Sequence, residues 1–314
     1  MRSDEPTKVD EHTQVDEHTQ VDEPTPVEVL RRFNRTFTQR IGALDESFLG
    51  SGRSLGLSRL LFEIGTAGAD VADVRARLGL DSGYLSRLLR QLEGEGLVAV
   101  TSHPVDGRRR QVQLTRAGQA EWHRLDADSD QAAAALLAPL STRQQAEIVA
   151  AIDVVDRLLA AASVTFDVVD PASEPAQAAM QAYFDELDRR FPTGFDATGA
   201  ASSDLEALAP PTGTFLLARR GAEAVGCGGV QSLGDGVGEV KRMWIHPEWR
   251  GLGLARRLLA TLEDHAEQLG HRRVVLDTNG ELVEAVALYG SAGYQPVERY
   301  NDNPYAQHWF AKSL

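Results

Sequence analysis

The residues best suited to chemistry lie between 239 and 257, in the sequence EVKRMWIHPEWRGLGLARR. A β-branched and aromatic run ends at Pro247, and a helical pattern opened by glycine follows it. Arg250, Gly253 and Ala255 stand at the spacing R-x-x-G-x-A. Small residues at the N-terminus of a helix let backbone N–H groups close around a phosphate. The stretch therefore predicts a site that holds the pyrophosphate of a cofactor.

The same strand, loop and helix also admit a dinucleotide-binding fold. Gly251 and Gly253 open the helix, and Asp277 closes the next strand about twenty residues on. Two features count against this alternative. Arg256 stands where a third glycine would let the helix pack closely on the strand, and too few residues follow for a second βαβ unit.

The elements that must position this loop alternate between strands and helices. The patterns predict a strand at 164–169, a helix at 177–190, strands at 214–219, 222–233 and 238–246, a helix at 251–269, a strand at 272–278, a helix at 281–292 and two short strands. A second characteristic stretch, LDTNGELVEAVALYGSAGY, runs from Leu276 to Tyr294 and ends in the pattern L-Y-x-x-x-G-aromatic. Together the two stretches resemble the GNAT acetyltransferases over residues 164–314. The resemblance implies an α+β fold with a central mixed sheet and acetyl-coenzyme A as the acetyl donor.

The resemblance also implies roles for individual residues. Backbone groups at the end of the fourth strand would pair with pantetheine and polarise the acetyl carbonyl, and they belong to Met243, Trp244 and Ile245. The pyrophosphate would be held by Arg250, Gly251, Leu252, Gly253, Leu254, Ala255 and Arg256. Tyr289 would protonate the departing thiolate, a role that suits a phenol because its ordinary pKa of about 10 exceeds the value of about 8.5 for a thiol. Glu284 stands where the family usually has an asparagine, which leaves the contacts of that helix open.

Other assignments rest on position in the chain. Asn279 ends the fifth strand and is expected either to bind the cofactor or to cap the next helix. Glu239 is the predicted general base, and a surface pair with Lys241 is the alternative, because alternation along the strand puts both on one face. The C-terminal run RYNDNPYAQHWFAKSL is rich in polar and aromatic groups. It is expected either to cap the sheet or to line a pocket for an amine acceptor with Asp302, Asn303 and Tyr305, in which Asp302 attracts the ammonium.

A different pattern precedes this region. Two short helices flank the turn Leu78-Gly79-Leu80, and leucines at helical spacing turn inward in the second helix. The side chains left facing outward are Ser82, Tyr84, Ser86, Arg87 and Arg90. Two β-prone runs follow and are joined by a turn at Asp106-Gly107, with Arg108, Arg109 and Arg110 at its tip. A helix-turn-helix and a basic hairpin predict contact with double-stranded DNA.

The sequence DGRRRQVQLTRAG and the helix before it resemble the MarR family of winged-helix regulators, over residues 27–163. The resemblance implies a homodimer formed by the terminal helices, with two recognition helices spaced about one turn of DNA apart, and a small-molecule effector. The alternative is that these helices only complete the core of a monomer.

Charge is distributed unevenly along the 314 residues, whose formal net charge is −14. Residues 29–116 carry fourteen arginines against nine acidic residues, a basic segment in an acidic protein. Residues 1–26 repeat QVDEHT and are expected to be a disordered acidic tail. No apolar run reaches the roughly 20 residues of a membrane span, no metal cluster is evident, and the single cysteine cannot pair within the chain, so a cytoplasmic protein is expected.

The sequence thus predicts a multidomain protein: a tail at 1–26, a mostly helical winged helix-turn-helix domain at 27–163 and an acetyltransferase domain at 164–314. The predicted function is a transcriptional regulator that is also an acetyl-coenzyme A-dependent N-acetyltransferase for a primary amine. Two alternatives stay open. The winged helix could serve only for dimerisation of an amine acetyltransferase, or the second domain could only sense acetyl-coenzyme A.

Overall fold

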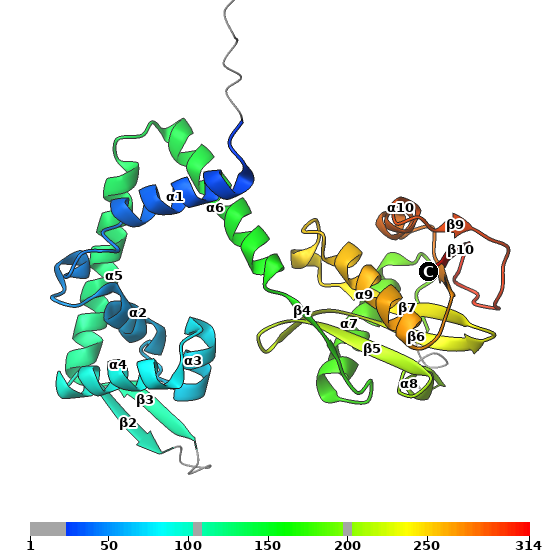
Figure 1. Ribbon diagram of the computed structural model, residues 1–314, viewed down its shortest axis with the longest axis horizontal. Helices are drawn as coiled ribbons and strands as arrows, with labels where there is room; N and C mark the ends of the chain where they lie inside the picture. The colour runs from blue at the N-terminus through cyan, green and yellow to red at the C-terminus, as the bar shows by residue number, and fades with distance from the viewer. Residues whose placement is uncertain (1–22, 103–108, 197–202) are drawn as a thin grey trace, which may run out of the picture. The chain divides into compact units, whose positions relative to one another are not determined.

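The computed structural model describes residues 23–102, 109–196 and 203–314 (Figure 1). The chain divides into two compact units, Met1–Pro139 and Leu140–Leu314. Helix α6 (Thr142–Ala162) is therefore part of the second unit, and Ala161 near its end is buried in the core of that unit. The domain boundary predicted at 163/164 stays a prediction. Most of the predicted tail, residues 1–22, and Arg108 of the predicted hairpin lie outside the described residues.

The first unit is mostly helical. Its elements are α1 (Pro26–Arg40), η1 (Phe48–Gly50), α2 (Leu55–Ile64), β1 (Ala69–Asp70), α3 (Val71–Leu78), α4 (Ser82–Gly94), β2 (Val98–Ser102), β3 (Arg110–Leu114) and α5 (Arg116–Leu137). The Asp70 carboxylate accepts from Ala72 N and caps α3, and Asp81 accepts from Tyr84 N and caps α4. Gly79 takes the left-handed conformation between them, and the strands form an antiparallel sheet in the order β1-β3-β2. The expected helix-turn-helix and the antiparallel pairing of the two strands of the hairpin are confirmed.

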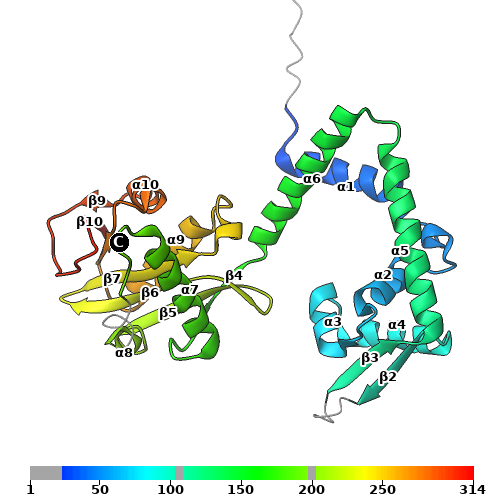
Figure 2. The ribbon, with the colours of Figure 1, turned by 180° about the vertical axis from the view of Figure 1, so that it is seen from behind.

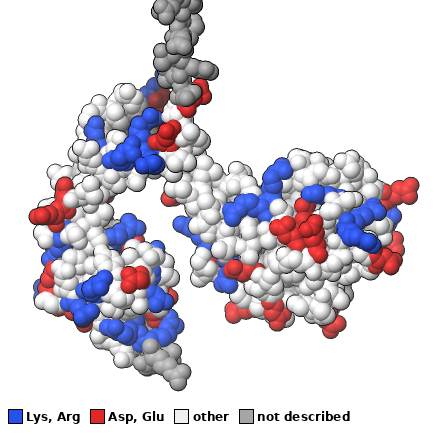
Figure 3. All heavy atoms as spheres, in the orientation of Figure 1, with Lys and Arg blue, Asp and Glu red and all other residues white. Residues whose placement is uncertain are grey.

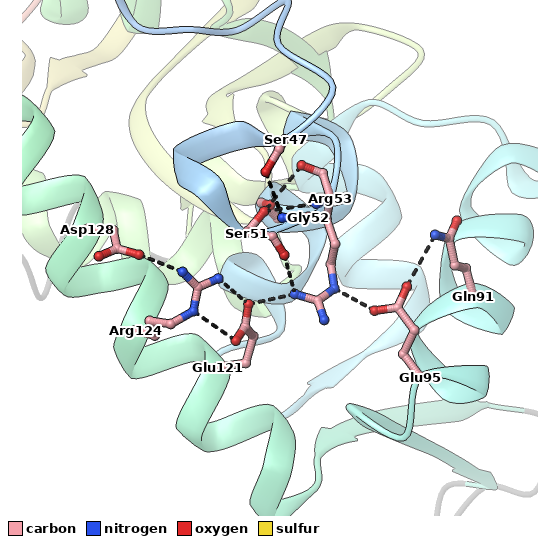
Figure 4. A network of polar contacts seen from close by, with 10 residues as sticks. Ser47, Ser51, Gly52, Arg53, Gln91, Glu95, Glu121, Arg124 and Asp128 are labelled. Atoms are coloured by element: carbon pink, nitrogen blue, oxygen red, sulfur yellow. Dashed lines mark hydrogen bonds and ion pairs between the residues drawn. The ribbon is translucent and has the colours of Figure 1, made fainter.

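An ion-pair network joins three segments of the first unit, namely the loop before α2, the C-terminal end of α4 and helix α5 (Figure 4). Arg53 Nε lies 2.5 Å from Glu95 Oε2, just after α4, and Arg53 Nη1 lies 2.6 Å from Glu121 Oε1 on α5. Arg124 binds the same Glu121 carboxylate at 2.6 Å and Asp128 at 2.7 Å. Because these side chains come from segments far apart in sequence, the network fixes the C-terminal end of α4 against α5.

The second unit is built on a seven-stranded sheet. Its elements after α6 are β4 (Thr165–Val168), α7 (Glu174–Arg190), α8 (Ser203–Ala207), β5 (Gly213–Arg220), β6 (Glu223–Gly234), β7 (Val237–Ile245), η2 (Pro247–Trp249), α9 (Leu254–Gln268), β8 (Arg273–Thr278), α10 (Val283–Ser291), β9 (Gln295–Pro296) and β10 (His308–Ser313). The strand order is β4-β5-β6-β7-β8-β10-β9. In it β7 and β8 run parallel and the other neighbouring pairs are antiparallel. The expected mixed sheet is confirmed, and the parallel doubly wound sheet of a dinucleotide-binding fold is wrong for this chain.

Helices cover both faces of this sheet. In β5, Leu216 and Ala218 are buried in the core under α9, whereas Phe215 and Leu217 are buried in the core under α7. Figures 1 and 2 show α9 and α7 on opposite sides of the strands. Alternate side chains of a strand point to opposite faces of the sheet. The apolar run Phe215–Ala218 therefore fits a strand that is buried on both sides.

Arg257 fixes the end of α6 to this unit. Its guanidinium, on α9, donates to Ala161 O at 2.7 Å and to Val164 O at 2.9 Å. It also lies over the Phe166 ring, 5.2 Å from the centroid. The Ala161 carbonyl in the last turn of α6 thus receives a cation, which is favourable at a helix C-terminus, and the Val164 carbonyl just beyond the helix receives the same one.

The described part of the chain lacks two kinds of feature. None of its helices combines the length and the apolar composition needed to cross a membrane. No group of three or more His, Cys, Asp or Glu residues is placed to hold a metal ion there.

Candidate functional site

Two adjacent strands separate at the centre of the second unit. The parallel pairing of β7 and β8 ends at Glu239 and Val275, although β7 continues to Ile245 and β8 to Thr278. The pairing of β7 with β6 shifts between Cys227 and Gly229, where Arg242 has a positive φ of 56°. Such a bulge bends a strand and increases its local twist. Beyond it, β7 turns away from β8 and leaves backbone groups on one side without a neighbouring strand.

Two cavities open at this separation. One has a volume of about 490 Å³ and is called here the acceptor-side cavity, because it is lined by Asn303 and Tyr305 of the predicted acceptor pocket. The other has a volume of about 540 Å³ and is called the loop-side cavity, because Arg250, Gly251 and Gly253 line it. The residues that line both are Tyr183, Leu187, Met243, Leu282, Ala285 and Tyr289. The cavities therefore meet at a shared wall of aromatic and apolar side chains.

The glycine loop lies where the sequence predicts it. Gly251 and Gly253 have φ values of 76° and 78°, and a Cβ on either would meet no atom within 4 Å. Gly253 is the N-cap of α9. The loop thus leaves open space in front of a helix N-terminus, where backbone N–H groups are available to an anion. Leu252 differs from its neighbours, because it packs partly against the core and is not among the residues lining either cavity.

Arg250 makes contacts that the sequence does not predict. Its Nε donates to Ile245 O at 2.9 Å, and its Nη2 lies 2.5 Å from Glu186 Oε2. Trp244 Nε1 donates to the same oxygen at 2.8 Å. Glu186, on α7, is buried, and sequence reasoning missed it because it lies 64 residues before Arg250. Two of the guanidinium nitrogens of Arg250 already bind protein atoms. Contact of Arg250 with a pyrophosphate stays a prediction.

We expect Glu186→Gln to destabilise the second unit by about 1.5–3 kcal/mol at pH 7, the usual range for hydrogen bonds to a charged group. Burial alone would raise the pKa of Glu186, but the hydrogen bonds from Arg250 and Trp244 outweigh it and lower this pKa below 4.5. A carboxylate whose pKa is lowered by folding stabilises the fold at pH values above its unfolded pKa of 4.5, and this stabilisation is lost as the pH falls through its pKa in the folded state. Urea titrations measure the free energy of unfolding, and the difference between Glu186→Gln and the parent should be smaller at pH 4 than at pH 7. The exposed Glu267→Gln is the control and should unfold with the free energy of the parent at both pH values.

Tyr289 lies at the junction of the two cavities and is buried. Burial raises the pKa of its phenol well above 10, and the nearby Tyr183 and Asp277 raise it further. A phenol with a raised pKa stays protonated at neutral pH and can donate. Its position fits the predicted proton donor, and the assignment itself stays a prediction.

Glu239 departs from the role of general base predicted for it. It is buried, and its Oε1 accepts from Tyr300 Oη at 2.9 Å and from Asn301 Nδ2 at 3.2 Å. Its Oε2 lies 2.6 Å from Gln231 Nε2 and 3.3 Å from Lys241 Nζ. Glu239 is not among the residues lining either cavity. The alternative pair with Lys241 is present, and this carboxylate holds the C-terminal segment against β7.

The C-terminal segment lies over one end of the acceptor-side cavity. Asn303 and Tyr305 line it as predicted, but Asp302 is fully exposed and pairs with Arg299 at 3.2 Å. Asn279 lines this cavity rather than the loop-side one. Its Nδ2 donates to Tyr305 O at 2.6 Å, and its Oδ1 accepts from Glu281 N at 2.9 Å. Asn279 does not cap α10, whose N-cap is Leu282 without a side-chain hydrogen bond. Its side chain instead joins two backbone segments, and its contact with the cofactor stays a prediction.

Sequence reasoning missed several residues of the acceptor-side cavity. Asp277 lines it from the end of β8, and Tyr183 and Phe191 line it from α7 and its C-terminus. Phe195 lines it from the loop that follows α7. The only available signal for Asp277 was its place at the end of a buried strand beside the predicted loop. The aromatic side chains lie about a hundred residues away in sequence, and no local pattern connects them to the site.

In the first unit, α4 presents the predicted outward face. Tyr84, Arg87 and Arg90 are exposed or partly exposed, whereas Leu85, Leu88, Leu89 and Leu92 are buried. The Arg87 guanidinium lies over the Tyr84 ring, 5.7 Å from its centroid, and Arg90 Nε donates to Ser86 O at 3.1 Å. Ser82 is exposed in the first turn. The face is polar and basic, as contact with a phosphate backbone requires.

The hairpin adds two described arginines to this end of the unit. Arg110 is exposed, and Arg109 Nε lies 2.9 Å from Asp70 Oδ2, which ties the hairpin to the start of α3. Figure 3 shows basic side chains gathered where β2 and β3 reach the surface. The turn that the sequence predicts at Asp106-Gly107, together with Arg108, lies outside the described residues.

Comparison with known proteins identifies the second unit. A model of the acetyltransferase (GNAT) family matches residues 178–294, and a model of the MarR family matches residues 58–109. An IAA acetyltransferase from Azospirillum brasilense is 37% identical over 134 residues, which make up 41% of this chain and 88% of that relative. The chain belongs to the GNAT acetyltransferase family. Both resemblances seen in the sequence are confirmed, and the GNAT unit makes the chain an acetyltransferase.

Other similar proteins match part of the chain. The N-alpha-acetyltransferase RimI of Mycobacterium tuberculosis is 34% identical over 36% of this chain and 70% of its own length. A solved structure of a probable transcriptional regulator from Pseudomonas aeruginosa covers 40% of this chain and 93% of that chain, with 23% identity and a TM-score of 0.34.

The residues of the GNAT domain fit acetyl-coenzyme A. The open space in front of Gly251 and Gly253 is a cradle that a Cβ would occupy, and it faces the N-terminus of α9. The loop-side cavity continues from there along Met243, Trp244 and Ile245 to Tyr289. Arg256 and Ala255 also line it, and Arg256 Nη2 donates to Ser291 Oγ at 2.6 Å. A long donor with an anionic end and a reactive end therefore suits this shape.

Proposed function

We propose that the chain is an acetyl-coenzyme A-dependent N-acetyltransferase for a primary amine and also a DNA-binding regulator. The observation that carries the first half is the separation of β7 from β8, where two cavities share a wall that includes Tyr289. One cavity suits the coenzyme and the other an acceptor. The name of the RimI relative, an N-alpha-acetyltransferase, also supports an amine acceptor.

Acetyl-coenzyme A, when bound, supplies an acetyl thioester, which an amine nitrogen attacks so that a C–N bond forms and the C–S bond breaks. The backbone N–H groups of β7 beyond the bulge would polarise the carbonyl of this thioester. Tyr289 gives its proton to the departing sulfur and regains one from the nitrogen. An ammonium that enters protonated thus releases one net proton to solvent for each acetyl group transferred.

The proposed activity is tested by two measurements on the full chain. Calorimetry with acetyl-coenzyme A measures binding to the loop-side cavity, and a thiol-release assay with a panel of primary amines measures transfer. Binding together with amine-dependent thiol release is expected. Binding without release for any amine would favour a domain that only senses the cofactor.

The second half of the proposal rests on the exposed basic face of α4 and the hairpin. We expect Arg87→Ala with Arg90→Ala to weaken binding to promoter DNA at every salt concentration, because each lysine or arginine on a phosphate releases counterions. The logarithm of the DNA-binding constant falls with the logarithm of the salt concentration, and if each arginine contacts one phosphate this slope should become less steep by about 2 in the variant. Fluorescence anisotropy at several salt concentrations measures this slope.

The control removes the same charge from the other unit. Arg189 on α7 and Arg273 on β8 are both exposed, so Arg189→Ala with Arg273→Ala tests whether the loss of two positive charges alone weakens binding. The affinity of this control for DNA should equal that of the parent. Unchanged DNA binding by the Arg87 and Arg90 variant would instead favour a winged helix that serves only for dimerisation.

We further propose a homodimer, as the MarR family resemblance implies. The apolar side chains Val27, Leu30, Phe33 and Phe37 of α1 are between 42% and 65% exposed. In α6 the exposed apolar side chains are Ile148, Val149, Ile152, Val154, Val155, Leu158 and Leu159. Apolar surface of this extent is typical of an interface. Sedimentation equilibrium of the full chain measures the oligomeric state, and a monomer at micromolar concentration would contradict the proposal.

A further inference from the structure

Aromatic rings form one wall of the acceptor-side cavity. Phe191, Phe195 and Tyr305 line it, and none of the three lines the loop-side cavity. The ring centroids of Phe195 and Tyr305 are 4.8 Å apart, and those of Phe191 and Tyr305 are 5.9 Å apart. Phe195 and Tyr305 are only partly buried, so part of each ring remains accessible. This wall offers apolar, flat surface to an acceptor.

The same cavity holds the Asp277 carboxylate. Its Oδ1 accepts from Asn303 Nδ2 at 3.0 Å, and its Oδ2 accepts from Asn301 Nδ2 at 2.5 Å. Both donors are neutral amides, which fix the carboxylate without compensating its charge. Among the described residues, no lysine, arginine or histidine forms an ion pair with Asp277. A negative charge held in a cavity in this way attracts a cation.

The two cations that line the cavity already have partners. Lys241 Nζ lies 3.3 Å from Glu239 Oε2, and the Arg242 guanidinium lies over the Phe184 ring, 4.8 Å from its centroid. An acidic acceptor would have to displace these contacts. Asp196 also lines the cavity, so the carboxylates Asp196, Asp277 and the Glu239 that pairs with Lys241 outnumber the two cations, and this balance favours a cationic acceptor over an anionic one.

Asp277 lies toward the junction of the two cavities. Burial is the largest cause of the raised pKa of Tyr183 and of Tyr289, the two tyrosines that line both cavities, and the Asp277 charge raises both further, whereas Arg242 lowers the pKa of Tyr183. The ring wall lies in the acceptor-side cavity alone. An acceptor that places its charged end at Asp277 thus presents it toward the coenzyme side and its body toward Phe195 and Tyr305.

We propose that the acceptor is a primary amine carried on an aromatic body, with Asp277 binding the ammonium and Phe195 and Tyr305 packing against the ring. This substrate class rests on the proposed acetyl transfer, but its binding site can be tested without it. The carboxylate and the rings come from three separate segments, and together they select for both charge and shape.

The test uses 2-phenylethylamine, with propylamine as a probe that has the amine but lacks the ring. We expect kcat/KM for 2-phenylethylamine to exceed that for propylamine by about tenfold or more, the scale of one good aromatic contact. Asp277→Asn should lower kcat/KM for 2-phenylethylamine by about a hundredfold, as the loss of a charge-assisted contact does. Phe195→Ala should reduce the preference for the ring and leave kcat/KM for propylamine nearly unchanged.

Calorimetry separates this inference from the proposed activity. Binding of 2-phenylethylamine to the coenzyme A-loaded chain should be lost in Asp277→Asn and kept in Asp264→Asn, an exposed carboxylate on α9. That result supports the acceptor site even if no acetyl group is transferred, in which case only the proposed activity fails. Equal kcat/KM values for 2-phenylethylamine and propylamine would overturn the inference while acetyl transfer stands. So would a loss of 2-phenylethylamine binding in Asp302→Asn with binding unchanged in Asp277→Asn. Unchanged binding of acetyl-coenzyme A in Asp277→Asn shows that this variant is folded.

Discussion

Tyr289→Phe should lower kcat for acetyl transfer by about 10²- to 10⁴-fold, the usual contribution of a general acid. The substitution removes one oxygen from a buried side chain that lines both cavities, and the ring stays in place against Tyr294 and Phe310. Binding of acetyl-coenzyme A should therefore change little. The thiol-release assay measures kcat, and calorimetry measures the dissociation constant of acetyl-coenzyme A.

The pH dependence sharpens this expectation. Burial raises the pKa of Tyr289 well above 10, so the phenol stays protonated and can donate throughout the range from neutral to mildly alkaline pH. The parent enzyme should accordingly show no loss of kcat from ionisation of Tyr289 between about pH 7 and 10. The phenyl ring of the Tyr289→Phe variant cannot donate a proton, and the defect of this variant should be similar across the same range.

Tyr294→Phe is the matched control. This tyrosine lies 5.9 Å from Tyr289 between ring centroids and is also buried, but it is not among the residues lining either cavity. Its kcat should stay close to that of the parent. A Tyr289→Phe variant with normal kcat would contradict the assignment and direct attention to another proton donor.

Gly118→Ala should destabilise the first unit by about 3 kcal/mol or more, at the upper end for overpacking. A Cβ on Gly118 would lie 1.9 Å from Leu97 O and 2.9 Å from Leu97 C, which are backbone atoms. This glycine lies in the first turn of α5, where its N–H donates to the Thr115 cap at 3.0 Å. Thr115 N in turn donates to Leu97 O at 2.9 Å. Because these contacts join α5 to the start of β2, the added methyl group must move a helix or a strand.

Hydrogen exchange of the full chain measures this effect separately in each unit. Protection in α5, β2 and β3 should fall, while protection in the strands of the second unit should stay as in the parent. Gly94→Ala is the control, because a Cβ at this helical glycine meets no atom within 4 Å and alanine favours a helix by about 0.5–1 kcal/mol. Equal stability of the Gly118→Ala variant and the parent would show that α5 and β2 can separate at little cost.

The sequence by itself determined the local elements and the features that depend on neighbouring residues. The glycines before α9, the caps of α3 and α4, and the alternation of leucines in α4 each act over a few positions, so their types predict their conformation. Observed boundaries agree closely: the strand expected at 272–278 is β8 at Arg273–Thr278, and the helix expected at 281–292 is α10 at Val283–Ser291. The choice of Tyr289 came from the resemblance to the GNAT acetyltransferases, which the pattern L-Y-x-x-x-G-aromatic carries.

Only the tertiary structure decided which charged groups face the reaction cavities. Glu239 and Asp277 are both carboxylates on adjacent strands, and sequence reasoning chose the first as the base. The Tyr300 and Asn301 contacts, brought in by a segment some sixty residues later, bury Glu239, whereas β8 leaves Asp277 facing the acceptor-side cavity. Arg250 is likewise paired by Glu186 from another helix. Burial and ion pairing depend on segments that meet only after folding, so residue type and spacing alone do not determine them.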